Sequence, residues 1–429
     1  MKTVMNNVEE NQQKRDKKTM VPRLRFPEFN NADDWKKKPL GDVAFFFKGK
    51  GLPKSEISLN ATNLCIHYGE LFSDYSEVIT SVRSRTNLEI DCFFSVENDV
   101  LMPTSDVTPR GLAKACCIKL NDVILGGDIL VIRSDKLLMN GEFLSRLIRY
   151  YESQVLQLVS GSTVFHLYAS SMEKMVIVFP GIEEQQKIAD CLSSLDDLID
   201  ASAKKLELLK DHKKGLMQKL FPAENETIPK FRFPEFKNAP EWKKSCLEEI
   251  AKFITDRLRL EQLSLNNYIS TENMLPDFGQ IKTASKLPTS GSVTKFQAND
   301  ILISNIRPYL KKVWFSDKAG GASNDVIIIR SKKIVIEQFL LFLLKNEIFI
   351  NYMMKGVKGV KMPRGDISLI KKYQISYPFD KNEQKSLVKC LCSLDDLITA
   401  QTQKLDTLKK HKKGLMQQLF PVMDNEVSG

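Results

Sequence analysis

Adjacent carboxylates are the first residues in this sequence whose types could do chemistry. Asp196-Asp197 and Asp395-Asp396 have the composition of an acid–base pair. Both pairs fall within predicted helices, however, and neighbouring residues on a helix do not face each other. The pattern therefore favours a solvated or subunit-contacting face over catalysis.

The other motifs for catalysis or ligand binding are incomplete. Gly49-Lys50-Gly51 lacks the third glycine and the preceding strand of a nucleotide-binding loop. The sequence has no Gly-x-x-x-x-Gly-Lys-Ser/Thr loop and no Asp/Asn-Pro-Pro-aromatic tetrapeptide of an amino-methyltransferase. His212 and His411 lie beside lysines in a helical repeat, which favours a solvated or partner-facing position. We therefore expect that the chain itself catalyses nothing.

Bulk composition narrows the class of protein. The 429 residues predict two to four domains, and 42% hydrophobic residues suffice for real cores. Eight cysteines without a CxxC motif or an expected secretory leader predict reduced thiols in a cytoplasm and no metal site. The most apolar run, 334–350, is interrupted by Glu337, Lys345 and Glu347, so no membrane span is expected. A net charge of +10 with a pI near 9.0 points toward a polyanionic partner, although many soluble proteins share such a surplus.

The aspartate pairs and the two histidines described above lie on a long segment that occurs twice in the sequence. Residues 183–221 return almost unchanged as 382–420, with Phe221 and Phe420 lying 199 residues apart. Apolar residues alternate at intervals of four and three, which predicts two helices packed along a heptad seam. The seam residues are Ile188, Leu192, Leu195, Ile199, Leu206 and Leu209, and in the second copy Leu387, Leu391, Leu394, Ile398, Leu405 and Leu408.

Polar residues occupy two positions of this seam in both copies. Ser202 corresponds to Gln401, and Lys213 corresponds to Lys412. Polar seam residues typically fix register and orientation. We expect these four to do so here.

A second repeat precedes each helix at a different spacing. Arg25-Phe26-Pro27-Glu28-Phe29 followed by Trp35 returns as Arg232-Phe233-Pro234-Glu235-Phe236 followed by Trp242, 207 residues later. The intervening region is therefore eight residues longer in the first half (207 − 199 = 8). For Trp35, Trp242, Phe26 and Phe233, their matched positions favour core packing over a role as stacking platforms.

The divergent regions share a skeleton of turns, strands and helices. An Asn-Asp turn at Asn98-Asp99 and at Asn299-Asp300 enters a β-rich run. Residues 128–134 and 325–331 predict buried strands, and 142–159 and 337–355 each predict one helix. The order is thus globule, helix, globule, helix.

These motifs together resemble the specificity subunit of a type I restriction-modification system, and the resemblance spans Val21 to Pro421. Besides the repeated RFPEF…W segment, it rests on a Pro-x-x-x-Glu-Gln motif, an SLDDLI block at Ser194 and Ser393, and KKGLMQ-x-LFP at Lys213 and Lys412. The Pro-x-x-x-Glu-Gln motif comprises Pro180, Glu184 and Gln185, and in the second half Pro378, one extra residue, then Glu383 and Gln384. Residues 49–54 followed by 65–71 resemble one recurrent class of target-recognition domain.

The resemblance implies an α+β fold in which two α/β target-recognition domains alternate with two long helices that pair as an antiparallel coiled coil. The expected boundaries are a disordered tail 1–20, recognition domain 21–180, helix 181–222, recognition domain 223–378, helix 379–422 and a tail 423–429. Each domain would read one half of an asymmetric bipartite DNA target, and the helices would set the spacer between the halves.

The resemblance also implies partners. They are double-stranded DNA, two methyltransferase subunits and restriction or translocase subunits, in the cytoplasm and without a membrane. This chain would carry no cofactor, because S-adenosylmethionine, ATP and Mg would be held by the partner subunits. The candidate docking residues on the helices are Asp196, Asp197, Lys214, Asp395, Asp396 and Lys413.

Basic loop residues of the divergent regions are the candidates for DNA contact, since arginine can read guanine with two hydrogen bonds and lysine holds phosphate. They are Lys48, Lys50, Lys54, Arg83, Arg85 and Arg110 in the first half, and Arg307, Lys311, Lys312, Lys361 and Arg364 in the second. For any one of them the alternative is a solvated surface charge. For the whole chain the alternative is a coiled-coil scaffold with no role at DNA.

Overall fold

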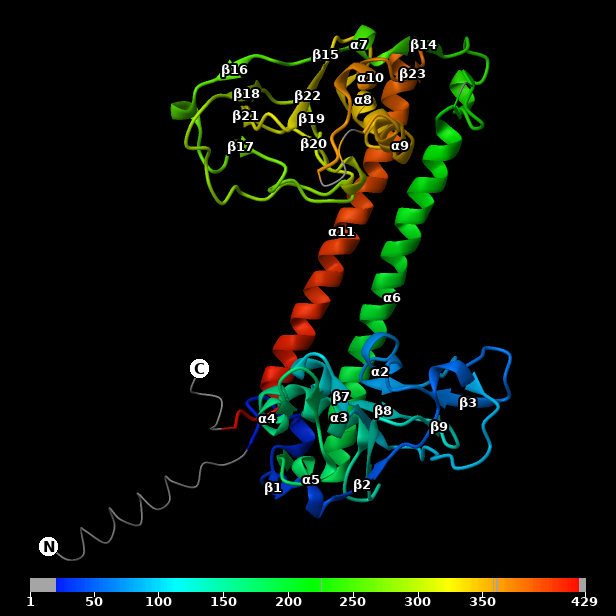
Figure 1. Ribbon diagram of the computed structural model, residues 1–429, viewed down its shortest axis with the longest axis vertical. Helices are drawn as coiled ribbons and strands as arrows, with labels where there is room; N and C mark the ends of the chain where they lie inside the picture. Colours follow the sequence, from blue (N-terminus) through cyan, green and yellow to red (C-terminus); the bar gives the residue numbers. More distant parts are fainter. Residues whose placement is uncertain (1–20, 225, 358, 360–361, 424–429) are drawn as a thin grey trace, which may run out of the picture. The chain divides into compact units, whose positions relative to one another are not determined.

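The computed structural model describes residues 21–423 except 225, 358, 360 and 361 (Figure 1). The expected tail 1–20, all of the expected tail 423–429 except Met423, and the candidate Lys361 lie outside the described residues. The chain divides into two compact units, of which the first takes its described residues from 21–203 and 404–423 and the second from 204–403.

The first unit is built on a five-stranded sheet of order β2-β10-β6-β8-β4. Its strands are β1 Lys36–Pro39, β2 Ala44–Lys48, β3 Asn63–Ile66, β4 Val78–Ile79, β5 Arg85–Thr86, β6 Val100–Pro103, β7 Ser105–Asp106, β8 Cys116–Ile118, β9 Ile124–Leu125, β10 Ile129–Ser134, β11 Ser160–Gly161, β12 Phe165–His166 and β13 Val176–Phe179. Its helices are α2 Glu70–Ser73, α3 Gly141–Tyr150, α4 Glu152–Leu158 and α5 Ala169–Met172. Smaller sheets, β1-β13, β5-β3-β9 and β11-β12-β7, complete the unit.

The second unit is built on a four-stranded sheet of order β15-β22-β19-β20. Its strands are β14 Lys243–Cys246, β15 Ala251–Phe253, β16 Arg257–Leu258, β17 Tyr268–Ile269, β18 Val293–Phe296, β19 Ile301–Ser304, β20 Val313–Phe315, β21 Gly320–Ala322, β22 Val326–Ser331 and β23 Gln374–Tyr377. Its helices are α7 Leu247–Ile250, α8 Glu337–Leu344, α9 Glu347–Lys355 and α10 Ile367–Lys371. The sheets β14-β23 and β16-β18-β21-β17 accompany the main one.

Four strands of the first main sheet have the same order as the four strands of the second. Strands β2-β10-β6-β8 of the first unit follow one another as β15-β22-β19-β20 do in the second. In both, the strand after the Asn-Asp turn pairs antiparallel with the long buried strand, Leu101 opposite Val131 and Leu302 opposite Ile328. The sequence repeat is therefore a repeat of structure, and the predicted buried strands are present in both halves.

The Asn-Asp turns have a physical reason for their residues. Asn98 and Asn299 adopt left-handed backbone conformations, with φ of 82° and 70°, which asparagine tolerates better than most residues. The aspartate that follows each of them is buried and pairs with the arginine at the end of the neighbouring strand. The distances are 2.7 Å for Asp99–Arg133 and 2.7 Å for Asp300–Arg330.

The prediction of one continuous helix at 142–159 and another at 337–355 is wrong. The first breaks at Tyr151, whose ψ of 35° leaves the helical region between α3 and α4. The second breaks at Lys345 and Asn346. The backbone of Asn346 is extended, and its side chain accepts a hydrogen bond from the Ile348 amide at the start of α9. Apolar periodicity continued across both breaks, so it could not reveal them.

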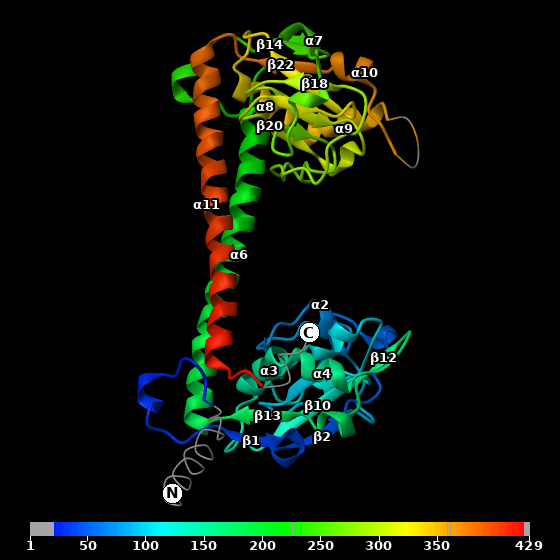
Figure 2. The ribbon, with the colours of Figure 1, turned by 90° about the vertical axis from the view of Figure 1, so that its left-hand side faces the viewer.

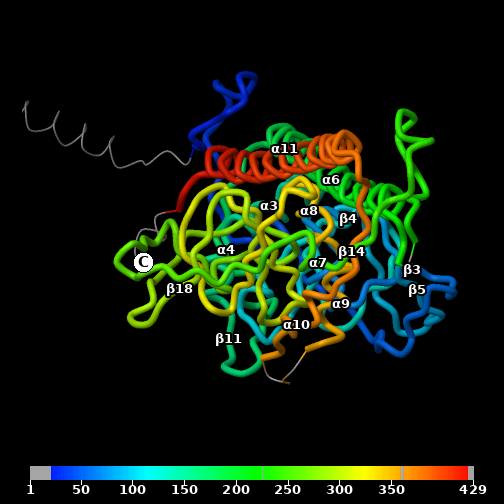
Figure 3. The backbone as a smooth tube through the Cα atoms, turned by 90° about the horizontal axis from the view of Figure 1, so that it is seen from above, coloured from blue at the N-terminus to red at the C-terminus, as the bar shows by residue number. Residues whose placement is uncertain are grey.

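Two long helices, α6 Ile182–Leu220 and α11 Lys381–Leu419, each contribute to both units. The first part of α6 and the last part of α11 belong to the first unit, and the remaining parts belong to the second. Within each unit the two helices run alongside each other in Figures 1 and 3 and overlap in the view of Figure 2. One ion pair joins them in each unit, Lys412 to Asp196 in the first and Lys213 to Asp395 in the second. No seam residue is exposed, whereas Leu198, Leu208 and Leu397, which lie off the seam, are 45%, 60% and 54% exposed.

The repeated sequence motifs tie each globule to the first turns of its own helix. Arg25 forms a two-pronged pair with Glu184, at 2.8 and 2.7 Å, and the Trp35 indole donates to the same carboxylate at 3.4 Å. In the second unit the equivalent distances are 2.7 and 2.7 Å for Arg232–Glu383 and 3.1 Å for Trp242. Both tryptophans are nearly fully buried, as the preference for core packing predicts.

We expect Glu383→Ala to destabilise the second unit by roughly 3–5 kcal/mol, because it leaves a buried guanidinium without its counter-charge. Urea unfolding followed by circular dichroism measures the effect. Glu235→Ala, which removes an exposed carboxylate of the same motif, is the matched control and should change little. Equal stability of the two variants would contradict a structural role for the Arg232–Glu383 pair.

Candidate nucleic-acid interface and helix seam

Three of the six candidate DNA contacts of the first unit lie at the surface beside an acidic residue. The ion pairs are Lys48–Asp128 at 3.2 Å, Lys50–Asp91 at 2.6 Å and Arg110–Glu152 at 3.1 Å. The Arg85 guanidinium instead donates to the Thr62 carbonyl at 2.7 Å. Lys54 and Arg83 are exposed, and no acidic partner is found for either among the described residues. Some of these loop cations are thus neutralised by a neighbouring carboxylate, and others are not.

The candidates of the second unit gather on adjoining loops. The segment between β19 and β20 carries Arg307, Lys311 and Lys312, and the β-bridge between Ile306 and Arg364 joins it to the loop before α10. Lys311 pairs with Glu347 at 2.9 Å, and Arg364 pairs with Asp325 at 2.9 Å. The structure therefore brings four of the five predicted residues together, and the fifth, Lys361, is outside the described part.

The lysines of the helix seam form reciprocal ion pairs with the repeated aspartates. In the first unit Lys412 of α11 approaches Asp196 of α6 at 2.5 Å and Glu77 at 3.1 Å. In the second unit Lys213 of α6 approaches Asp395 of α11 at 2.5 Å. Each copy of the helix thus gives a lysine to the other copy and receives one from it. Both lysines thus contact the opposite helix, and their role in fixing the register stays a prediction.

Asp196 and Asp395, predicted as docking residues, are consequently engaged within the chain. Asp196 also accepts from the fully buried Arg146 at 2.6 Å. Asp197 and Asp396 are exposed, as is Lys413. Lys214 is exposed and pairs with Glu347 at 3.3 Å. An outward-facing surface remains on each helix, where the exposed Asp197 adjoins Leu198 and Asp396 adjoins Leu397.

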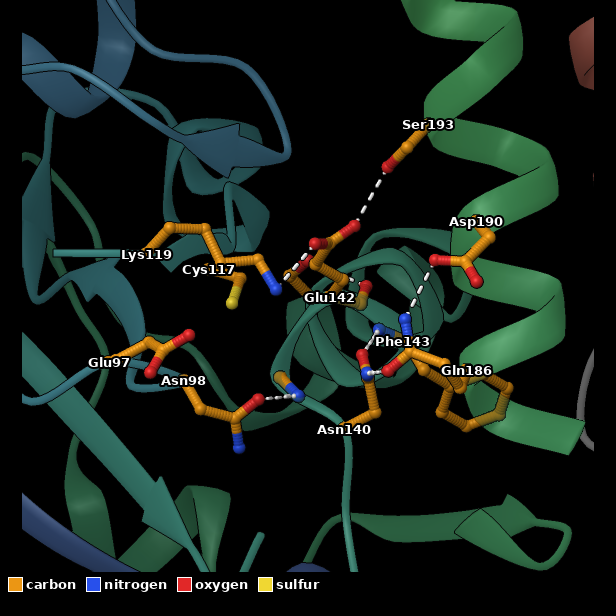
Figure 4. Close-up of polar contacts among 12 residues, drawn as sticks. Glu97, Asn98, Cys117, Lys119, Asn140, Glu142, Phe143, Gln186, Asp190 and Ser193 are labelled. Atoms are coloured by element: carbon orange, nitrogen blue, oxygen red, sulfur yellow. Dashed lines mark hydrogen bonds and ion pairs between the residues drawn. The ribbon is translucent and has the colours of Figure 1, made fainter. Parts of the chain in front are cut away.

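A polar network joins α3 to the first turns of α6 in the first unit (Figure 4). Glu142 receives Lys119 at 2.6 Å and the Ser193 hydroxyl at 2.7 Å. Asn140 caps α3 by accepting from the Phe143 amide, and its side chain donates to Gln186 at 2.7 Å. Burial alone would raise the pKa of Glu142, but the hydrogen bonds from Lys119 and Ser193 lower it. Glu142 therefore stays ionised and holds the helix to the globule.

Sequence reasoning missed Glu77 and Arg146, which lie outside both repeats. Arg146 stands within a predicted helix and is 1% exposed, a burial that periodicity does not reveal. The signal for the Asp99–Arg133 and Asp300–Arg330 pairs was present, because both members occur at matched positions in the two halves.

The described residues lack the features of a metal site and of a membrane span. No group of three or more His, Cys, Asp or Glu side chains there could hold a metal ion. No helix of the described part is long and apolar enough to cross a bilayer. The eight cysteines are free thiols.

Comparison with known proteins assigns both halves to one family model. Residues 32–211 and 240–410 match the type I restriction modification DNA specificity domain. The MjaVIII type I restriction enzyme specificity subunit of Methanocaldococcus jannaschii is 26% identical over 423 residues, covering 92% of this chain and 93% of that protein. The putative MjaX specificity subunit of the same organism is 27% identical, covering 69% of this chain and 71% of that protein.

Two solved structures share the fold. A type I restriction-modification system S subunit from M. genitalium has a TM-score of 0.60 at 17% identity, covering 94% of this chain and all (100%) of that one. A structure from work on complex assembly and conformational transition of the type I R-M system has a TM-score of 0.53 at 16% identity, covering 90% and 97%.

We expect the Lys213–Asp395 pair to couple the two helices by about 1 kcal/mol, because both side chains are only partly exposed. A double-mutant cycle of Lys213→Ala, Asp395→Ala and the double variant, read by urea unfolding, measures this coupling. Replacing the exposed Asp396 by alanine is the control. Additive effects of the two alanines would show that the pair does not hold the register.

Glu77 makes the first unit sensitive to acid. Burial would raise the pKa of Glu77, but Arg149, Lys412 and the hydrogen bond from Lys412 lower it from 4.5 to about 2. The stabilisation by the carboxylate is therefore present above about pH 4.5 and is lost as the pH falls toward 2.

Glu77→Gln should accordingly reduce the free energy of unfolding at pH 7 by on the order of 3 kcal/mol and flatten its decline below pH 4.5. Chemical unfolding at pH 7 and at pH 3 checks both effects. Glu97→Gln, at the surface beside Lys136, is the control. An unchanged pH profile in Glu77→Gln would contradict the assignment.

Proposed function

Because this chain belongs to the type I restriction-modification DNA specificity family, we propose that each of its units reads one half of an asymmetric bipartite target in double-stranded DNA. As a specificity subunit the chain is the non-catalytic member of a methyltransferase and restriction complex. The observation that carries the proposal is that both units have the same main-sheet order yet different loops with different sets of cations. A shared scaffold with unlike loops suits two unlike half-sites.

The two long helices would pair as an antiparallel coiled coil and set the spacer between the half-sites. The reciprocal pairs Lys412–Asp196 and Lys213–Asp395 support opposite directions, because each joins the late part of one helix to the early part of the other. A helix of 39 residues is about 58 Å long. Readers on one face of a duplex must lie about one helical turn apart, roughly 34–36 Å, or a multiple.

The methyltransferase subunits would dock on equivalent surfaces, one for each repeat. Asp197 with Leu198 and Asp396 with Leu397 give two outward patches of the same composition, since both leucines are about half exposed. Two equivalent patches favour two copies of one partner. S-adenosylmethionine would lie in those partners, and ATP and Mg in the restriction or translocase subunits, working in the cytoplasm.

The test is to reconstitute the chain with its methyltransferase subunits and map methylated adenines in a randomised duplex library. We expect two short, unrelated half-sites separated by a fixed number of unspecified base pairs. Binding of the preferred duplex should weaken steeply with salt, because lysine and arginine contacts release counterions. Methylation without sequence preference, or by the isolated chain alone, would contradict the proposal.

Shortening both helices by one heptad should shorten the spacer. Deletion of residues 199–205 together with 398–404 removes about 10.5 Å of helix while preserving the seam, which corresponds to about three base pairs. The methylation map should show both half-sites unchanged and the spacer reduced. Insertion of one heptad at the same places is the matched control and should lengthen the spacer. If the deletion abolished half-site preference instead, the role of the helices as a spacer would be refuted.

A further inference from the structure

The loop between β19 and β20 in the second unit holds a strained backbone. Arg307 and Lys311, at the two ends of the 3-10 turn Pro308–Leu310, have φ of 50° and 54°. Left-handed geometry costs about 1–2 kcal/mol for a residue other than glycine. Such strain persists only where the surrounding structure over-determines it, and it clusters at functional sites.

Two neighbouring segments brace this loop. The Arg307 amide donates to the Pro363 carbonyl at 2.8 Å. On the other side, the amides of Asp277 and Phe278 donate to the carbonyls of Leu310 and Lys311, at 3.0 and 2.8 Å. Asp277 and Phe278 are themselves left-handed, with φ of 52° and 58°. The Pro363 carbonyl thus holds one end of the turn at Arg307, and the left-handed Asp277 and Phe278 hold the other end at Leu310 and Lys311.

The braced loop between β19 and β20 exposes the Arg307 side chain. Arg307 is exposed, and among the described residues no hydrogen-bond or ion-pair partner is found for its guanidinium. Its neighbours are engaged, Lys311 with Glu347, Arg364 with Asp325, and Lys312 with the Thr271 carbonyl at 2.6 Å. Among the described cations of this loop cluster, Arg307 is therefore the one available for a ligand.

The charge of Arg307 is also unfavourable to its surroundings. Burial lowers the pKa of Lys312, the nearby Arg307 lowers it further, and Glu272 offsets only part of the effect. Two like charges held together on a braced loop are relieved when an electronegative group lies between or beside them. The surroundings thus favour an acceptor-rich ligand at Arg307.

The corresponding loop of the first unit lacks this arrangement. Arg110, in the 3-10 turn Pro109–Ala113, pairs with Glu152, and the flanking Thr108 and Lys114 have ordinary extended backbones. The loop between β6 and β8 therefore has neither left-handed residues at the ends of its 3-10 turn nor an arginine without a partner. A general phosphate-holding role would not require them in one half only.

We propose, on the basis of the DNA-reading function above, that Arg307 reads a guanine in the major groove of the half-site recognised by the second unit. The planar fork of arginine matches the O6 and N7 acceptors of guanine, which is the commonest specific contact of this kind. A loop held in its bound shape loses little further conformational entropy when it binds. The braced backbone therefore fits a residue that discriminates between bases.

The experiment compares variants of the full chain in the reconstituted methyltransferase complex. Arg307→Lys keeps the charge and loses the fork, and Arg307→Gly removes the side chain where glycine adopts φ of 50° without strain. Methylated sites are mapped in a randomised duplex library, and urea unfolding reports folding. Arg364→Ala, a compensated cation of the same cluster, is the comparison variant.

The wild-type complex should require G·C at one position of one half-site. Both Arg307 variants should relax that single position by about 10- to 100-fold and leave every other position unchanged. Arg307→Gly should remain folded, and Arg364→Ala should keep all base preferences. Uniform weakening on all sequences, or an unchanged motif in the Arg307 variants, would overturn the inference while leaving the proposed function intact. A wild-type complex without sequence preference would instead refute the proposed function.

Discussion

The structure depends on a buried contact between a repeated arginine and the glutamate in the first turn of a long helix. Arg25 with Glu184 and Arg232 with Glu383 each form two parallel hydrogen bonds, and a buried tryptophan donates to the same carboxylate. Two parallel hydrogen bonds fix the relative orientation of the arginine and the glutamate, and so the angle at which each globule meets its helix. The side chains on the loops of each globule are therefore positioned, relative to its helix, by this contact.

The same contact explains why the repeat could be recognised from sequence at the edges of each half. The junction needs Arg, Trp and Glu at fixed places, and the seam needs apolar residues every three or four positions. Both requirements concern residues at fixed spacings along the chain, so they are visible as repeated motifs in the sequence. The matching sheet orders of the two units then follow from the matched strands and Asn-Asp turns.

Other features could not be predicted because they depend on contacts between distant segments. The breaks at Tyr151 and at Asn346 interrupt helices whose apolar pattern is continuous. Charge patterns showed that Asp196 and Asp395 are acidic but not that lysines of the opposite repeat reach them. Likewise the basic loop residues were identifiable by type, whereas the carboxylates that compensate Lys48, Lys50 and Arg110 come from segments that only the fold brings near.

The reciprocal lysine–aspartate pairs account for the contrast between closely similar helices and divergent globules. Because Lys412 meets Asp196 and Lys213 meets Asp395, a change in one copy of the helix must suit the other copy. Residues that face only their own globule are free of this constraint. Ser193 joins Arg146 and Glu142 in a polar network, while its counterpart Cys392 packs beside an apolar core. Loops such as the one bearing Arg307 are under no such mutual constraint, so the two readers can diverge while the helices that join them cannot.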